Sequence, residues 1–212
     1  GATGAGKSTL INILSRFYEV ESGNVSLDDV KIEKYDRSWL RKQIGVVLQD
    51  VFLFADSIYN NITLWDTSIS EEDVIAAAKK IGVHNFISSL PEGYHFNVKE
   101  RGGMLSTGQR QLIAFLRAYI TQPKILVLDE ATSSIDTHAE KLIQKATKEI
   151  TKGKTSLIIA HRLATIKRAN SIIVLDNGRI VETGTHSELL KIQGGIYKNL
   201  YEVQFVNAES VI

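Results

Sequence analysis

The feature that most constrains this sequence is a glycine-rich loop that leads directly into a helical pattern. The first nine residues read GATGAGKST and fit the pattern G-x-x-x-x-G-K-[ST] in full. In this pattern the glycines let backbone N–H groups wrap around a phosphate chain, the lysine reaches the terminal phosphates, and the hydroxyl binds Mg²⁺. Such a loop follows a strand, so we expect the N-terminal strands of the domain to precede this chain. The predicted phosphate-binding residues are Gly1, Thr3, Gly4, Ala5, Gly6, Lys7, Ser8 and Thr9.

Short apolar runs further along the chain indicate an α/β fold. KILVLDE, TSLIIAH and SIIVLD are bounded by breakers, and QIGVVLQD is a fourth buried run. Strands of this length alternating with helices predict a mostly parallel sheet covered on both faces. Asn177-Gly178 predicts a tight two-residue hairpin after the last of these runs. The patterning from about 57 to 120 is mostly helical, so we predict a helical subdomain inserted into an α/β core of residues 1–56 and 121–212.

Local signals mark individual helices. SEEDVIAAAKKIG predicts a helix that starts at Ser70, with Asp73 completing a capping box and Gly82 as the C-cap. After the first loop, apolar residues are spaced for one buried helix face. These residues are Leu10, Ile11, Leu14 and Phe17.

Composition narrows the class of protein. The chain has 212 residues, of which 43% are hydrophobic, as expected for a globular domain with a sizeable core. A net charge of +1 gives no basic surface for nucleic acid, so we expect no nucleic-acid partner. The lack of cysteine excludes disulfides, cysteine–zinc sites and thiol nucleophiles, and it suits the cytosol. No apolar run approaches the roughly 20 residues that span a bilayer, so a membrane role would require a partner or another segment.

Polar side chains end three of the predicted strands. Asp129 and Glu130 end ILVLDE, Gln49 ends IGVVLQ, and His161 ends TSLIIAH. The carboxyl ends of parallel strands form the ligand-binding edge of an open α/β sheet. There Asp129 would hold Mg²⁺ through water, and Glu130 would orient or deprotonate the attacking water. His161 would contact the γ-phosphate and Gln49 would meet Mg²⁺ or the water, although a lone strand-end Glu or His is more often structural.

A second candidate anion site lies within RGGMLSTGQRQ. Ser106, Gly108 and Gln109 stand at the start of another apolar helix. N–H groups and the positive end of the helix dipole favour anions at such a place. One chain therefore carries two predicted phosphate sites.

In their order, these motifs resemble those of the nucleotide-binding domain of ABC transporters, over essentially the whole chain. The glycine-rich loop, a glutamine loop, the signature LSTGQ, ILVLDE, SSID and a switch histidine follow one another as in that family. The resemblance implies a P-loop NTPase core that binds ATP and Mg²⁺, with Lys7 in the catalytic set. It also implies head-to-tail pairing with a second nucleotide-binding domain. Ser106, Gly108 and Gln109 would then contact the partner's ATP, and Asp136 of SSID would lie at the interface.

Two further segments resemble those of exporters. In VKERGGMLS, Glu100 is a candidate for contact with transmembrane domains. In VFLFADSIYNNI, Phe52 and Phe54 are candidates for the same contact, and the alternative is that both side chains belong to the hydrophobic core. The resemblance places the domain at the cytoplasmic face of the cell membrane, held there by transmembrane domains outside this chain. Three alternatives remain: an importer subunit, a soluble ABC ATPase, and a regulatory domain that binds ATP without turnover. The lack of heptad repeats and of basic stripes disfavours the soluble ATPase. The presence of Glu130 disfavours the regulatory domain.

The signature departs from the family at Thr107, where glycine is usual. Glycine tolerates positive φ and close approach to phosphate, so we expect a β-branched threonine to fit less well, with a tolerated substitution as the alternative. An altered signature beside an intact Glu130 resembles the catalytic chain of a heterodimeric exporter. We therefore expect a partner chain with a regular signature and no glutamate at the position equivalent to Glu130.

Overall fold

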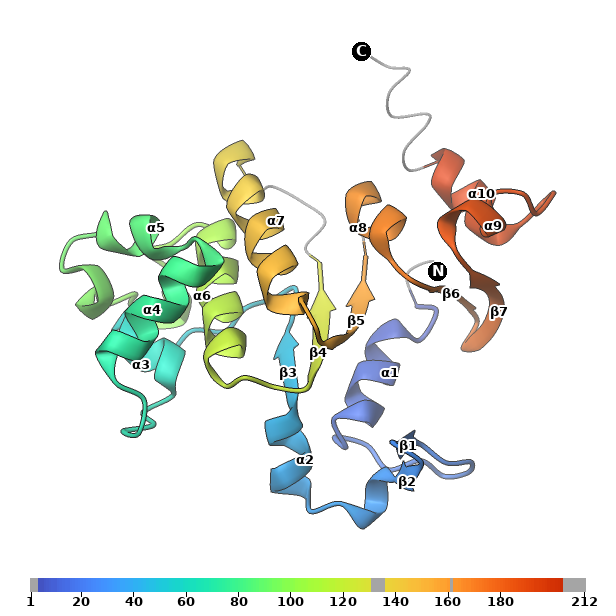
Figure 1. Ribbon diagram of the computed structural model, residues 1–212, viewed down its shortest axis with the longest axis horizontal. Coiled ribbons are helices and arrows are strands. Elements are labelled where there is room, and N and C mark those ends of the chain that lie inside the picture. Colours follow the sequence, from blue (N-terminus) through green and yellow to red (C-terminus); the bar gives the residue numbers. More distant parts are fainter. Residues whose placement is uncertain (1–3, 131–135, 161, 204–212) are drawn as a thin grey trace. The chain divides into compact units, whose positions relative to one another are not determined.

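The computed structural model describes residues 4–130, 136–160 and 162–203, which are drawn as ribbon in Figure 1. The chain divides into two compact units, one of Gly1–Tyr35 with Ile159–Ile212 and the other of Asp36–Ile158. No helix in the described parts of the chain combines the length and the apolar character needed to cross a membrane. Each unit is taken by itself below.

The first unit contains a helix that follows the glycine-rich loop, two antiparallel hairpins and a C-terminal helical segment. Its elements are α1 (Lys7–Leu14), β1 (Ser26–Leu27), β2 (Val30–Lys31), η1 (Ile32–Lys34), α8 (Leu163–Arg168), β6 (Ile172–Asp176), β7 (Arg179–Gly184), α9 (His186–Leu189) and α10 (Ile196–Tyr201). The turn of the second hairpin is Asn177-Gly178, with φ of 47° and 74°. Positive φ at both central residues is what a type I′ turn requires, and Asp176 pairs with Arg179 across it, so the predicted two-residue hairpin is confirmed.

The second unit combines a parallel sheet with a group of helices. Its elements are α2 (Arg37–Gln43), β3 (Ile44–Val47), α3 (Ile58–Thr63), α4 (Glu71–Ile81), α5 (His84–Ser88), η2 (Gly93–His95), η3 (Glu100–Gly102), α6 (Thr107–Ile120), β4 (Ile125–Asp129), α7 (Thr137–Thr151) and β5 (Thr155–Ile159). The strand order is β3-β4-β5, β3 and β4 pair in parallel, and all three arrows run the same way in Figure 1. The predicted α/β fold with a parallel sheet is confirmed.

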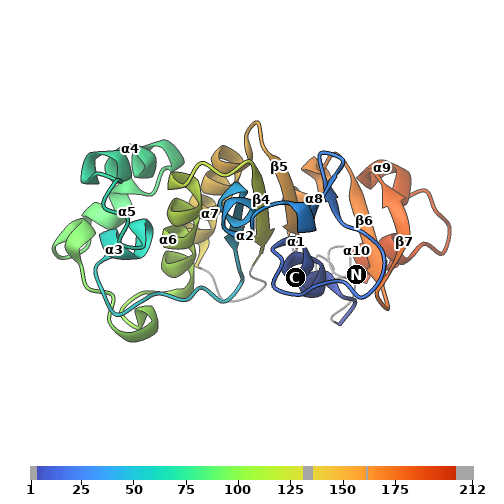
Figure 2. The same cartoon turned by 90° about the horizontal axis from the view of Figure 1, so that it is seen from below.

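Helix α6 is the central helix of the second unit. It contacts α3, α4, α7 and β3, and in Figures 1 and 2 the helices α3 to α6 lie side by side. Leu112, Ile113 and Leu116 of this helix are at most 1% exposed and join Leu126 and Leu128 of β4 in one hydrophobic core. Burying each such side chain contributes roughly 1.5–3 kcal/mol, so the position of α6 is firmly set by packing.

The signals read for the helix after Ser70 are confirmed. The Ser70 hydroxyl accepts a hydrogen bond from the Asp73 N–H at 3.1 Å, and the Asp73 carboxylate accepts one from the Ser70 N–H at 3.3 Å. Gly82 ends α4 with φ of 83°, the left-handed conformation of a C-cap. Local sequence therefore sets both ends of this helix.

The single buried face predicted after the first loop is wrong in part. Ile11 is buried, but Leu10 is 45% exposed and Phe17 is 63% exposed. Helix α1 ends at Leu14, and Arg16 takes a left-handed φ of 51°, so the chain leaves the helix before Phe17. The predicted division into residues 57–120 and a flanking core stays a prediction.

Candidate functional site

The described part of the glycine-rich loop has the backbone of a phosphate-binding turn. Gly4 and Gly6 have φ of 83° and 98°, and Gly6 is the N-cap of α1. Left-handed residues in a tight turn direct successive N–H groups into one concavity, and the first turn of the following helix adds its own. Lys7, Ser8 and Thr9 form that first turn, with the Ser8 and Thr9 side chains exposed. Residues 1–3, which include Gly1 and Thr3, lie outside the described residues.

A hydrogen bond that the sequence did not predict connects this loop to the hairpin of β6 and β7. The Gly178 N–H, in the turn between β6 and β7, donates a hydrogen bond to the Ala5 carbonyl at 3.2 Å. The C=O and N–H of a trans peptide point in opposite directions, so a carbonyl turned toward Gly178 leaves the Gly6 N–H pointing away from the hairpin. The only sequence signal was the Asn-Gly pair, which predicts the turn but not what it touches.

Three of the predicted catalytic and metal residues lie at one edge of the sheet. The register pairs Val47 of β3 with Leu128 of β4. Gln49 and Glu130, each two residues further on, therefore lie at the same carboxyl end, together with Asp129. Glu130 is 7% exposed and Gln49 is exposed. His161, predicted for the same edge, lies outside the described residues.

The signature residues cap the central helix. The Ser106 hydroxyl accepts from the Gln109 N–H at 3.3 Å, and the Gln109 side-chain oxygen accepts from the Ser106 N–H at 2.9 Å. Gly108 is buried within α6. In the same way, the Asp136 carboxylate caps α7 by accepting from the N–H groups of residues 138 and 139. Ser106 is exposed, and a serine hydroxyl that accepts in a cap still has its own proton to donate to an anion.

The backbone at Thr107 does not require a glycine, while the expected poorer fit of threonine to a facing phosphate stays a prediction. Thr107 is the first residue of α6 and does not have positive φ, so its conformation suits an L-residue. Its hydroxyl accepts a hydrogen bond from Arg110 Nη2 at 3.1 Å, while Arg110 Nη1 donates to the Leu105 carbonyl at 2.7 Å. Threonine thus adds a contact that glycine could not make.

Three aromatic side chains form an exposed cluster on the second unit, which we call the aromatic surface. Phe52, Phe54 and Trp65 are 55%, 40% and 50% exposed, so the core alternative for the two phenylalanines is wrong. The ring of Phe54 lies edge-on to the rings of Phe52 and Trp65, at centroid distances of 5.1 and 4.9 Å. Trp65 Nε1 also donates to Asp56 at 3.0 Å. The pKa of Asp56 is lowered by hydrogen bonds to its carboxylate from the Ser57 N–H, from Asn60 and from Trp65. Sequence reasoning missed Trp65.

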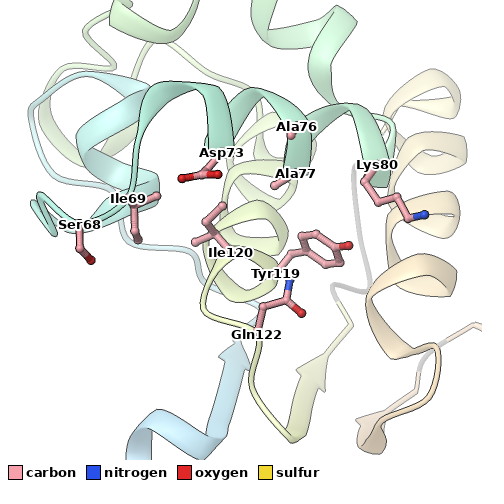
Figure 3. A pocket seen from close by; sticks show the side chains of 9 residues that line it. All are labelled: Ser68, Ile69, Asp73, Ala76, Ala77, Lys80, Tyr119, Ile120 and Gln122. Carbon is pink, nitrogen blue, oxygen red and sulfur yellow. The ribbon is translucent and has the colours of Figure 1, made fainter.

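A cavity of about 450 Å³ lies elsewhere in the second unit, between α4 and the end of α6 (Figure 3). It is lined by Ser68, Ile69, Asp73, Ala76, Ala77, Lys80, Tyr119, Ile120 and Gln122. None of the predicted site residues is among them. The cavity is therefore separate from the candidate site.

Comparison with known proteins identifies the family. The family model described as ABC transporter matches residues 1–133, which is more than half of the chain. The chain belongs to the ABC transporter family. This confirms the resemblance drawn from the order of the motifs.

The relatives of this ABC transporter domain are longer proteins. The chain is 52% identical over 204 residues to exp8 of Streptococcus pneumoniae, named as an ABC transporter ATP-binding protein, covering 96% of the chain and 35% of the relative. It is 48% identical to a Staphylococcus aureus protein named for multidrug export and as an ATP-binding/permease protein, covering 96% and 35%. A structure titled as a bacterial Atm1-family ABC exporter with ATP bound is 40% identical with a TM-score of 0.88, covering 97% and 36%. The chain spans about a third of the length of these relatives.

Proposed function

We propose that this chain is the ATP-binding and ATP-hydrolysing domain of an ABC exporter. The observation that carries the proposal is the loop from Gly4 to the start of α1, whose left-handed glycines suit a phosphate chain. The relative named for multidrug export and the similar exporter structure with ATP bound support export. They favour it over an importer subunit and over a soluble ABC ATPase.

The proposed reaction is attack of water on the γ-phosphorus of ATP, with cleavage of the bond to the β-phosphate oxygen. Lys7 and the N–H groups of the loop would hold the phosphates and offset the charge on the leaving side. Glu130 would accept the proton of the attacking water, and its place at the carboxyl end of β4 suits that role. Gln49 and His161 would orient the water and the γ-phosphate.

The donor atoms also suit Mg²⁺. Ser8 offers a hydroxyl, Gln49 an amide oxygen and Asp129 a carboxylate, and Mg²⁺ prefers such hard oxygen ligands. The Ser8 side chain is exposed in the first turn of α1, and Gln49 and Asp129 share one sheet edge. Bound there with ATP, the ion would neutralise phosphate charge.

A second nucleotide-binding domain would complete the site. Ser106, Gly108 and Gln109 would contact the nucleotide held by that partner, and Asp136 would lie at the interface. The exposed Ser106 hydroxyl at the start of a 14-residue helix supports this role. We also propose that the partner is a different chain with a regular signature and no glutamate equivalent to Glu130. The sequence of the co-assembled chain tests this: a homodimer would contradict it.

Transmembrane domains would contact the second unit through the aromatic surface and Glu100. Exposed aromatic clusters commonly mark interaction sites, and Glu100 is exposed at the start of η3. The domain would then work at the cytoplasmic face of the cell membrane. Phe52 and Phe54 immediately precede the stretch of about 57–120 that we propose as the helical subdomain.

ATP binding and turnover by the full-length protein in lipid nanodiscs test the proposal. Lys7→Ala should abolish tight ATP binding or turnover, because it removes a charge from the β- and γ-phosphates. Lys80→Ala, an exposed lysine at the end of α4, is the matched control and should behave as the unaltered protein. Unchanged affinity together with unchanged turnover in Lys7→Ala would contradict the proposal.

A further inference from the structure

A half-buried arginine joins the central helix to the segment that carries the aromatic surface. Arg117 lies on α6, the helix that begins with the signature. Its Nε donates to the Asn61 carbonyl at 2.7 Å, its Nη1 to the Phe52 carbonyl at 3.3 Å, and its Nη2 to the Asn61 side-chain oxygen at 3.4 Å. One planar guanidinium therefore connects three oxygens that lie more than 50 residues earlier in the chain.

Asn61 extends this connection to Phe54. Asn61 is 0% exposed, and its side-chain oxygen accepts from the Phe54 N–H at 2.8 Å. Its amide nitrogen donates to the carbonyls of Phe54 and Ser57, both at 3.0 Å. Both donors of the amide group are used, and both backbone polar groups of Phe54 are held by one side chain.

These bonds determine how the aromatic surface is presented. Leu53, between the two phenylalanines, is 0% exposed and anchors the segment by packing, which is not directional. The hydrogen bonds to Phe52 and Phe54 fix the orientation of the flanking peptides and so turn both rings outward. Burial also lowers the pKa of Arg117, whose three acceptors described above are neutral oxygens.

We propose that Arg117 and Asn61 are positioning residues that carry a displacement of α6 to the aromatic surface. The inference rests on the proposed function, because the signature at the start of α6 would meet the nucleotide and the aromatic surface would meet the transmembrane domains. A shift of α6 on nucleotide binding would then shift the backbone of Phe52 and Phe54 through directional bonds. The chain of hydrogen bonds is the physical route of this coupling, and a coupling measurement tests it.

Photo-crosslinking in the full-length protein provides that measurement. A benzophenone amino acid replaces Phe54, and crosslinks to the transmembrane segments are mapped by mass spectrometry with and without a non-hydrolysable ATP analogue. Arg117→Lys keeps the charge but cannot span three oxygens, and Asn61→Asp keeps the shape but turns an acceptor toward the carbonyls of Phe54 and Ser57. Arg37→Lys, exposed at the start of α2, is the control.

We expect the nucleotide-dependent change in crosslink yield to shrink about threefold or more in Arg117→Lys and Asn61→Asp, within the range for mutations that alter coupling. Nucleotide affinity should be unchanged, and Arg37→Lys should keep the full change. An equal change in all variants would overturn the inference. No crosslink to a transmembrane segment in any background would instead overturn the docking proposed for the aromatic surface.

Hydrogen exchange tests the inference independently of docking. In the same full-length proteins, the analogue should alter exchange across residues 52–57 when Arg117 and Asn61 are intact. The alteration should be lost in Arg117→Lys and Asn61→Asp. The inference would be overturned if the analogue did not change exchange in the unaltered protein, or if it changed exchange in both variants as much as in the unaltered protein.

Discussion

Gly6→Ala tests the phosphate loop through a single added methyl group. Gly6 has φ of 98° and ψ of 8°. A Cβ there would meet the Gly178 Cα at 3.6 Å, an ordinary contact, so alanine fits the space and the cost is backbone strain. Left-handed conformations cost an L-residue about 1–2 kcal/mol, and the free energy of unfolding should fall by that amount if the loop keeps its shape.

The same substitution should weaken ATP binding if the loop relieves the strain by rotating. The Gly6 N–H would then turn away from the phosphates, and a hydrogen bond to a charged group contributes about 1.5–3 kcal/mol. ATP affinity should therefore fall about 10- to 100-fold, since 1.4 kcal/mol corresponds to a factor of ten. Calorimetric titration of the full-length protein with a non-hydrolysable ATP analogue measures this affinity, and thermal unfolding measures the stability.

Gly23→Ala is the matched control for this experiment. Gly23 lies in the same unit with φ of 87°, and nothing lies within 4 Å of an added Cβ. The Gly23→Ala variant should lose similar stability without loss of ATP affinity, because Gly23, unlike Gly6, lies outside the phosphate-binding loop. Equal loss of affinity in both variants, or a Gly6→Ala variant that loses neither stability nor affinity, would refute the argument from backbone geometry.

Three other perturbations have defined outcomes. Asp136→Ala should lower the free energy of unfolding by about 1 kcal/mol, because α7 loses the cap that accepts two N–H bonds; an unchanged melting temperature would contradict this. Thr107→Gly should cost about 0.5–1 kcal/mol of stability in the first turn of α6 yet barely change turnover in a heterodimer, whereas a clear rise in turnover would mean that the facing site is catalytically active. Acidification below about pH 6.5 should destabilise the protein through His186, because burial and then Lys167 lower the pKa of His186 and the unfolded chain takes up the proton first. His186→Gln should flatten the fall in melting temperature over that range, and an unchanged pH profile would contradict the assignment.

Features that depend on neighbouring residues could be predicted from the sequence. The capping box of Ser70 and Asp73 and the Asn177-Gly178 turn are local, because each rests on contacts within a few residues. The shared edge of Gln49 and Glu130 followed from a general property of parallel sheets.

Features that depend on contacts distant in sequence could not be predicted. Two such contacts are the hydrogen bond from Gly178 to Ala5 and the hydrogen bonds between Arg117 and Asn61. Each joins residues more than 50 positions apart, so no local sequence pattern predicts it. The backbone at Thr107, by contrast, follows from a local pattern. Ser106 and Gln109 have the spacing of a capping box, which places Thr107 in the first helical turn, where a threonine needs no positive φ.

Turnover of the full-length protein carrying Glu130→Gln tests the central claim most directly. The claim is that this chain hydrolyses ATP with Glu130 as the residue that activates water. ATP affinity should be unchanged, because the phosphate loop is intact, while hydrolysis at saturating ATP should slow by roughly 10²–10⁴, the range for loss of a general base. Hydrolysis within a few-fold of the unaltered protein, at equal ATP occupancy, would contradict it.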